Sequence, residues 1–176
     1  MPTLLQITPV EMVLRVASAT VGASEVPPNT NTGLYVERVL ARTRTPKGNP
    51  WCASWVSDVG AIALGAEWPV VLTASVQAMC DWARDKGCRY VATKVPPLPG
   101  DLFALWFPSL KRYAHVGIVW SVNADGTVQS LEGNTSQPGD NNPATQREGW
   151  CVAQRIRTLT DRDRLIRWTE AMLGPA

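Results

Sequence analysis

The chain has 176 residues, a length that fits one hydrophobic core, so we expect residues 1–176 to form a single domain. Hydrophobic residues make up 45% of the chain and charged residues 18%, which excludes a largely disordered protein. The net charge of +2, from 17 basic and 15 acidic residues, is too small for a protein whose main partner is nucleic acid.

Residues 1–22 lack the basic segment, apolar run and small-residue cleavage site of a secretion signal, and no apolar stretch reaches the length of a membrane span. We therefore expect a soluble protein that is made in the cytoplasm and has no membrane partner. The cysteines at positions 52, 80, 88 and 151 are too sparse for a disulfide framework and form no CxxC pair. With a single histidine in the chain, no structural zinc site and no cofactor are expected.

Helical signals dominate the first part of the chain. The segment Thr8-Pro9-Val10-Glu11 has the spacing of a capping box with proline at the first helical position, which predicts a helix over about 9–22. A turn-rich stretch over 25–33 follows, and after it a short second helix is expected to end before Pro46.

Two further helices are predicted around the cysteines. From Trp51 onward the apolar residues recur at helical spacing, which places Cys52 in the first turn of a helix. Thr73 is expected to cap the next helix, which runs to Lys86 and stops at Gly87.

After residue 88 the chain changes to four short apolar runs: DLFALWF, HVGIVWSV, TVQSLEGN and WCVAQRIR. The segment Asn123-Ala124-Asp125-Gly126 is a hairpin turn between the second and third runs. Helices followed by antiparallel strands predict an α+β domain. We interpret 161–173 as a closing helix and the basic-rich stretch 155–167 as a solvated helix face without a function.

One set of residues could carry nucleophilic chemistry. Cys52 sits at a predicted helix start, where the helix N-terminus and a nearby imidazole would both stabilise a thiolate. His115 is the single histidine and therefore the one candidate base. A hairpin would bring Glu132 beside His115, where a carboxylate holds the imidazole tautomer. Asn134, two residues further along the same strand, is an alternative orienting group.

The remaining cysteines and tryptophans have less specific interpretations. Cys80 and Cys151 fall in core patterns, and Cys80 could pair with Cys88 only under oxidising conditions. Three tryptophans are candidates to line a substrate groove, although the one beside the cysteine is most simply explained as core; they are Trp51, Trp106 and Trp150.

Four ordered segments, PWCASWVSDV, PLPGDL, HVGIVW and LEGNTS, together with the loop EVPPNTNTG, resemble the CHAP family of cysteine- and histidine-dependent amidohydrolases and peptidases. The resemblance covers roughly residues 8–158. It implies a papain-like half, in which helices that carry the nucleophile pack on a small antiparallel sheet that carries the histidine.

Carried over residue by residue, the resemblance implies that Cys52 attacks an amide carbonyl and that His115 activates the thiol and protonates the leaving amine. Glu132, or alternatively Asn134, would hold His115. The backbone N–H of Cys52 would stabilise the oxyanion, with the Asn49 side chain as a further candidate donor.

Some phage members of this family bind calcium through a loop of aspartates before the cysteine. The corresponding region of this chain offers only Glu25, Asn29 and Asn31. A hard cation usually needs more carboxylate ligands than this, so no required metal is expected.

The resulting hypothesis is a monomeric peptidoglycan hydrolase that cleaves an amide of the stem peptide or cross-bridge, as an endopeptidase or an N-acetylmuramoyl-L-alanine amidase. It would act in the periplasm or cell wall, either as an endolysin released through a holin or as an antibacterial effector paired with an immunity protein. A lysozyme would not need Cys52. The alternative from another class is a non-catalytic wall-binding module with a tryptophan surface.

Overall fold

The computed structural model describes residues 7–137 and 149–173. Its first helix, α1 (Pro9–Ala19), begins with the predicted capping box: the Thr8 hydroxyl accepts from the Glu11 backbone N–H, and the Glu11 carboxylate accepts from the Thr8 backbone N–H. The helix ends at Ala19, three residues short of the expected boundary, and buries Val13 and Ala17.

The next helices confirm most of the expected positions. They are α2 (Leu34–Arg42), α3 (Cys52–Leu64), the short 3₁₀ helix η1 (Gly65–Glu67) and α4 (Val76–Asp85). The expected cap of α4 was wrong, because Ser75 is the N-cap and its hydroxyl accepts from the Ala78 backbone N–H. Thr73 instead accepts a hydrogen bond from the Ser75 backbone N–H in the turn before the helix.

The strands form a six-stranded antiparallel sheet in the order β1-β6-β2-β3-β4-β5. The four predicted runs are the four longest strands, and the Asn123–Gly126 turn joins two of them, with Gly126 at a φ of 83°. The strands are β1 (Arg89–Val91), β2 (Leu102–Phe107), β3 (Arg112–Val122), β4 (Val128–Thr135), β5 (Cys151–Arg157) and β6 (Arg164–Ile166). The α+β class is therefore confirmed.

The interpretation of the C-terminal segment was wrong in two respects. Residues 161–173 form strand β6 followed by the short helix α5 (Trp168–Met172), not one closing helix. The stretch 155–167 is consequently not a helix face but lies on β5, β6 and the loop between them. The physical reason is the pairing of β6 with both β1 and β2, which buries Leu165 and Ile166 fully.

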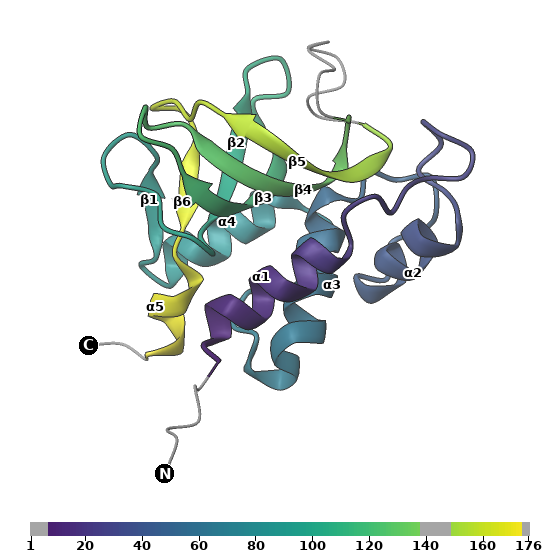
Figure 1. Cartoon of the computed structure of the whole chain (residues 1–176), viewed down its shortest axis with the longest axis horizontal. Helices are drawn as coiled ribbons and strands as arrows, with labels where there is room; N and C mark the ends of the chain where they lie inside the picture. The colour runs from purple at the N-terminus through teal and green to yellow at the C-terminus, as the bar shows by residue number, and fades with distance from the viewer. Residues whose placement is uncertain (1–6, 138–148, 174–176) are drawn as a thin grey trace.

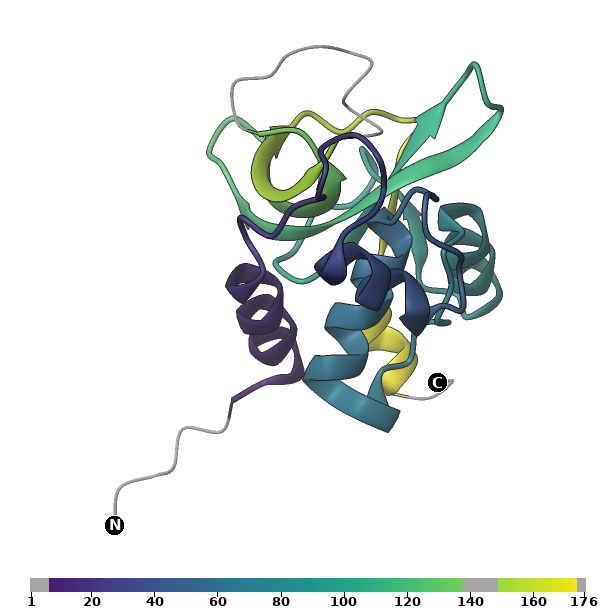
Figure 2. The same ribbon diagram turned by 90° about the vertical axis from the view of Figure 1, so that its right-hand side faces the viewer.

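The helices gather on one side of a curved sheet (Figures 1 and 2). Val116, Ile118 and Leu131 belong to the same core cluster as Trp55 of α3. Phe103 and Val119 belong to a second core cluster. Helix α3 is largely buried and contacts both β3 and β4, the two inner strands that carry His115 and Glu132. None of the described helices is long and apolar enough to cross a lipid bilayer.

Candidate active site

Cys52 is the first residue of α3, as predicted, and Trp51 is the N-cap. Backbone N–H groups in a first helical turn have no intrahelical acceptor and create a positive potential there, which favours a negative sulfur. Cys52 is 3% exposed and borders a pocket of about 140 Å³. The pocket is lined by Thr45, Asn49, Pro50, Cys52, Ala74, Val76, Arg112 and Ala114.

A buried carboxylate fixes the loop in front of Cys52. Oε1 of Glu25 accepts a 2.9 Å hydrogen bond from the Trp51 indole, and Oε2 accepts from the backbone N–H groups of Thr30 and Asn31 at 2.7 and 2.9 Å. Glu25 thus ties the 25–33 loop to Trp51, the N-cap of α3.

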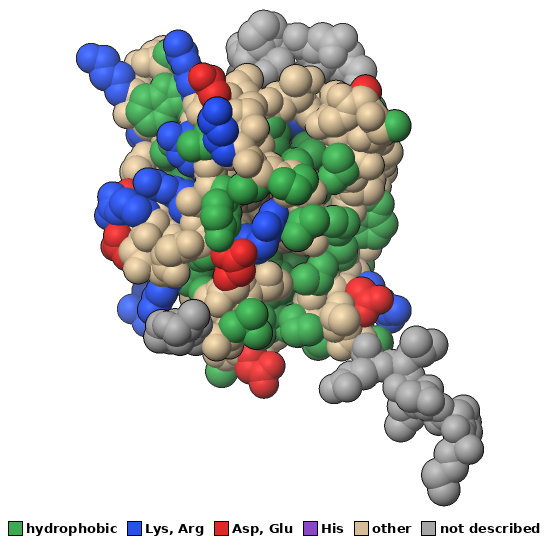
Figure 3. Space-filling view, turned by 90° about the vertical axis from the view of Figure 1, so that its left-hand side faces the viewer, with side chains coloured by type: hydrophobic (Ala, Val, Ile, Leu, Met, Phe, Trp, Pro, Cys, Tyr) green, Lys and Arg blue, Asp and Glu red, His purple; other side chains and the backbone are tan. Residues whose placement is uncertain are grey.

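His115 lies on β3, three residues after the strand begins, and its side chain is completely buried. In agreement with this burial, no histidine surface appears on the face of the molecule in Figure 3. Nε2 of His115 and Oε2 of Glu132 are 2.8 Å apart, which confirms that the hairpin brings these two side chains together. An ionised carboxylate can only accept a hydrogen bond, so Nε2 carries the proton and donates it.

A glycine makes room for this contact. The β3–β4 register pairs Ile118 with Leu131, and Gly117 therefore lies beside Glu132. A Cβ atom at position 117 would come within 2.7 Å of Cγ of Glu132 and within 2.5 Å of the Phe103 ring. Only glycine at this position lets the Glu132 side chain lie over β3 and reach His115.

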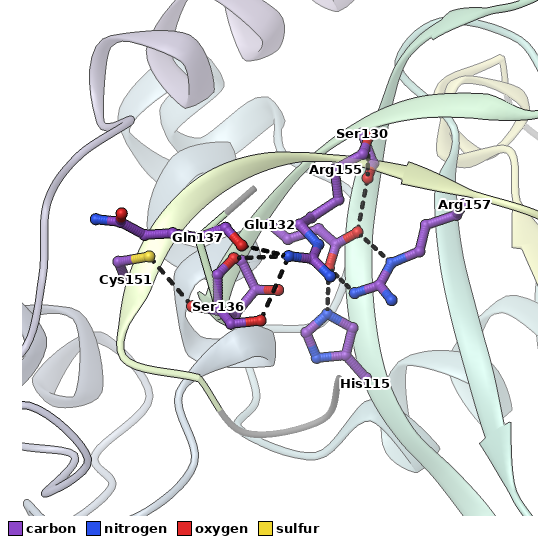
Figure 4. A network of polar contacts seen from close by, with 9 residues as sticks. His115, Ser130, Glu132, Ser136, Gln137, Cys151, Arg155 and Arg157 are labelled. Atoms are coloured by element: carbon purple, nitrogen blue, oxygen red, sulfur yellow. Dashed lines mark hydrogen bonds and ion pairs between the residues drawn. The ribbon is translucent and has the colours of Figure 1, made fainter. Parts of the chain in front are cut away.

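Two further side chains hold the Glu132 carboxylate (Figure 4). Arg157, at the end of β5, donates from Nε to Oε1 at 2.8 Å and from Nη2 to Oε2 at 2.6 Å. The Ser130 hydroxyl donates to Oε1 at 2.6 Å. Arg157 was not among the predicted site residues, because the basic residues of 155–167 were interpreted as a solvated helix face. The one available signal was the position of this arginine at the end of an apolar strand run.

The charges in this cluster reinforce one another. Burial alone would raise the pKa of Glu132, but the hydrogen bonds and positive charges of Arg157 and His115 outweigh it and hold that pKa well below its ordinary value. Burial alone would lower the pKa of His115, but hydrogen bonding and negative charge from Cys52 and Glu132 raise it to about 9. The His115 imidazole therefore binds a proton more tightly than an imidazole in water does.

Nδ1 of His115 is buried and has no close hydrogen-bond partner in the described part of the chain. The Cys52 thiol nevertheless acts on this ring, since Cys52 contributes to the raised pKa of His115. No regular hydrogen bond joins the thiol to Nδ1, which is common for a nucleophile and its base when no substrate is bound.

Asn134 does not take the orienting position. A register shift between Glu132 and Thr135 interrupts the β4–β5 pairing, and Asn134 has a φ of 55°, so the simple alternation of side chains fails here. Its amide is fully buried, and neither its nitrogen nor its oxygen has a hydrogen-bond partner within residues 7–137 and 149–173. The hydrogen bond to Nε2 of His115 belongs to Glu132.

The candidate oxyanion donor Asn49 lines the pocket beside Cys52, and its Nδ2 donates to the Pro46 carbonyl at 3.0 Å. An amide nitrogen has two protons, so one remains available to a ligand.

The three candidate groove tryptophans do not lie together. Trp51 is fully buried and bonded to Glu25, so its assignment to a groove was wrong. Trp106 packs edge-on against Tyr113 and lines a different pocket, between the ends of β2 and β5. Trp150 is half-buried and borders neither of these two pockets.

The other cysteines are free and buried. Burial raises the pKa of Cys80 to about 12 and the pKa values of Cys88 and Cys151 to about 11, so these thiols stay protonated near neutral pH. Across the described residues, no three His, Cys, Asp or Glu side chains gather in a way that could hold a metal ion. Glu25, the one carboxylate in the 25–33 loop, has both oxygens bonded to N–H groups of the chain itself.

A cysteine at a helix N-terminus, a buried histidine on the adjoining sheet and a carboxylate on its far ring nitrogen are the groups that thiol-dependent hydrolases use. The family model of the CHAP domain matches residues 44–134, about half of the chain. The chain therefore belongs to the CHAP domain family, whose members are cysteine- and histidine-dependent amidohydrolases and peptidases of peptidoglycan. No curated protein and no solved structure shows a significant match to the chain.

Proposed function

We propose that this protein hydrolyses an amide bond in the stem peptide or cross-bridge of peptidoglycan, with Cys52 as the nucleophile. The observation that carries the proposal is the hydrogen bond between Nε2 of His115 and Glu132, because it leaves Nδ1 as the ring nitrogen that can serve Cys52. The membership of the CHAP family supports the choice of peptidoglycan as substrate.

In the acylation step, Nδ1 of His115 takes the thiol proton and Sγ of Cys52 attacks the amide carbonyl carbon. The backbone N–H of Cys52 and the free proton of Asn49 Nδ2 stabilise the negative oxygen of the tetrahedral intermediate. The C–N bond then breaks, the imidazolium of His115 protonates the leaving amine, and a thioester remains on Cys52.

In the deacylation step, His115 removes a proton from a water molecule, which attacks the thioester carbonyl. The C–S bond breaks, the carboxylic acid product leaves, and the thiol of Cys52 is restored. Glu132 keeps the imidazole in one tautomer and stabilises its positive charge in both steps.

The pocket beside Cys52 favours a small, anionic peptide. Ala74, Val76 and Ala114 give it small apolar walls, which suit alanine or glycine side chains. Arg112 is the one charged residue among its lining residues and would bind a carboxylate. Peptidoglycan stem peptides combine small residues with free carboxylates, so this chemistry agrees with the proposed substrate.

The experiment that tests the function is digestion of purified peptidoglycan by the wild type, by Cys52→Ala and by the control Cys88→Ala, with the released fragments identified by mass spectrometry. We expect the wild type and the control to release the same fragments and Cys52→Ala to release none. New termini on the sugar side would show an amidase, and new termini within the peptide would show an endopeptidase.

A labelling experiment separates this function from a wall-binding module. Iodoacetamide at neutral pH should modify Cys52 first, because burial raises the pKa values of Cys80, Cys88 and Cys151 to about 11 or 12. Binding of the wild type to the wall without any release of fragments, together with an unreactive Cys52, would contradict the proposal. Digestion by Cys52→Ala at the wild-type rate would contradict the assigned nucleophile.

A further inference from the structure

Arg157 is the last residue of β5 and lies outside the segment that the CHAP family model matches. Its side chain is only 8% exposed and forms a two-point contact with the carboxylate of Glu132. A forked contact of this kind fixes the direction of a carboxylate as well as its charge.

The four contacts on Glu132 divide between its two oxygens. Oε1 accepts from Arg157 Nε and from the Ser130 hydroxyl, and Oε2 accepts from Arg157 Nη2 and from His115 Nε2. Rotation of the carboxylate would break at least two of these bonds. The oxygen that accepts from His115 is therefore also held by Arg157, as Figure 4 shows.

We infer that Arg157 is a positioning residue of the active site, which keeps Glu132 ionised and aimed at His115 so that the imidazole presents Nδ1 to Cys52. This inference rests on the proposed function for its catalytic consequence, but the arrangement that it describes can be tested without any substrate.

The reason lies in the burial of Glu132. A fully buried carboxylate without a cation takes up a proton far more easily than one in water. A protonated Glu132 can donate a hydrogen bond to Nε2 of His115. The ring proton would then move to Nδ1, and Nδ1 could no longer accept the thiol proton of Cys52.

A second pocket, of about 600 Å³, opens onto Arg157 between the ends of β2 and β5. Its walls include Leu105, Trp106, Ile156 and Thr158. This opening gives a direct test, because a guanidinium ion from solvent can enter the space that Arg157→Ala leaves.

The variants are Arg157→Ala, the conservative Arg157→Lys, and the matched control Arg167→Ala. Arg167 forms the same kind of two-point contact, with Asp101 at 3.1 and 2.9 Å, but belongs to a different carboxylate. Loss of either arginine should destabilise the fold, whereas only loss of Arg157 should change the protonation and orientation of Glu132 and His115.

For Arg157→Ala we expect kcat to fall about 100-fold, part of the 10²–10⁴-fold effect that a general base supplies, with little change in KM. The acid limb of the pH–rate profile should move up by about one unit or more, because Glu132 takes up a proton at higher pH. Arg157→Lys should lose less activity than Arg157→Ala, since lysine keeps the positive charge but cannot form the two-point contact with Glu132. Arg167→Ala should keep the wild-type kcat and acid limb.

Millimolar guanidinium chloride should restore activity and the acid limb in Arg157→Ala, and urea at the same concentration should not. If Arg157→Ala folds and keeps the wild-type kcat and acid limb, Arg157 does not position Glu132. If Arg157→Ala does not fold, the activities of Glu132→Gln and of the double variant Glu132→Gln/Arg157→Met are compared instead. Neither of these variants leaves an unpaired carboxylate in the core. Equal activity of this pair supports the inference, and a further large loss in the double variant overturns it.

A substrate-free readout separates this inference from the proposed function. His115 is the single histidine, so the imidazole ¹⁵N signals in an NMR spectrum belong to it without further assignment. Below the His115 pKa of about 9, the wild type and Arg167→Ala should show both ring nitrogens protonated, whereas Arg157→Ala, with Glu132 protonated, should populate a neutral ring with its proton on Nδ1. If Arg157→Ala shows this change but the wild type digests no peptidoglycan, the function alone is refuted, whereas an unchanged ring in Arg157→Ala would refute the positioning role.

Discussion

Gly117 and Glu132 lie against each other on β3 and β4, so closely that a Cβ atom at position 117 would be 2.7 Å from Cγ of Glu132. The Glu132 side chain occupies the space that a side chain at position 117 would otherwise fill. The geometry of the histidine–carboxylate pair therefore depends on a residue that has no functional group.

Gly117→Ala tests this dependence. The added methyl group must displace either Glu132 or the Phe103 ring, so we expect kcat to fall about 10- to 100-fold and unfolding to become easier by about 1–3 kcal/mol. The measurements are hydrolysis of soluble wall fragments and urea denaturation.

The control for this variant is Gly60→Ala, whose Cβ would meet the Trp68 ring at 2.1 Å within the core. We expect Gly60→Ala to lose stability while the folded protein keeps its kcat. Equal losses of kcat in both variants would show that general destabilisation, not displacement of Glu132, explains the effect.

The buried histidine makes stability depend on pH. The pKa of His115 is raised from 6.5 to about 9, so protonated His115 stabilises the fold fully below pH 6.5, and this contribution is lost as pH rises toward 9. The shift corresponds to about 3 kcal/mol. The pKa of Glu132 is lowered from 4.5, so its contribution is present above pH 4.5 and is lost as pH falls below that value.

We therefore expect the free energy of unfolding to be greatest between about pH 5 and 6.5 and to fall between pH 6.5 and 9, as urea titrations at fixed pH would show. In His115→Gln the decline above pH 6.5 should disappear. A wild type whose stability is flat from pH 6 to 9 would contradict the protonated state of this buried pair.

Arg112 should affect binding more than turnover. It is exposed on the pocket beside Cys52 and is the one charged lining residue there. We expect Arg112→Ala to raise KM about tenfold for wall peptides with a free carboxylate and to leave kcat nearly unchanged, because one charge-assisted contact is lost in ground and transition states alike. Amidation of the substrate carboxylate should abolish the difference, and Lys94→Ala, a basic surface residue outside the pocket lining, should behave like the wild type.

Glu25 should stabilise the entrance to α3. Glu25→Ala leaves the buried Trp51 indole without its acceptor and releases two backbone N–H groups, so we expect a loss of about 2–4 kcal/mol in unfolding experiments. Glu37→Ala on the exposed start of α2 should cost far less. Because protein N–H groups bond to both Glu25 oxygens, calcium should not raise the melting temperature and EDTA should not lower it; a calcium-dependent melting temperature would contradict this account.

The local features of the fold were predictable because each depends on neighbours in the chain. The capping box at Thr8 and Glu11, the helix start at Cys52 and the hairpin turn at 123–126 all have short-range signatures, and all are present. The hairpin also explains why the contact between His115 and Glu132 could be expected, since the turn sets the register between the two strands.

The errors concern contacts between segments far apart in the chain. A short apolar stretch such as Arg164–Ile166 is compatible with a helix or a strand, and its pairing with β1 and β2 decides between them. The interrupted register after Glu132 likewise depends on β5, so alternation along β4 could not place Asn134.

By itself, the sequence determined the α+β class, the position of Cys52 at a helix start and the candidate partnership of His115 with Glu132. Only the tertiary structure decided that Trp51 is buried against Glu25 rather than open to substrate, and that Arg157 is buried against Glu132 rather than solvated. The physical reason is that burial of a polar side chain is favourable only when a partner of matching charge and geometry lies beside it. In this protein, that partner is 26 residues away for Trp51 and 25 for Arg157, beyond the reach of any local pattern.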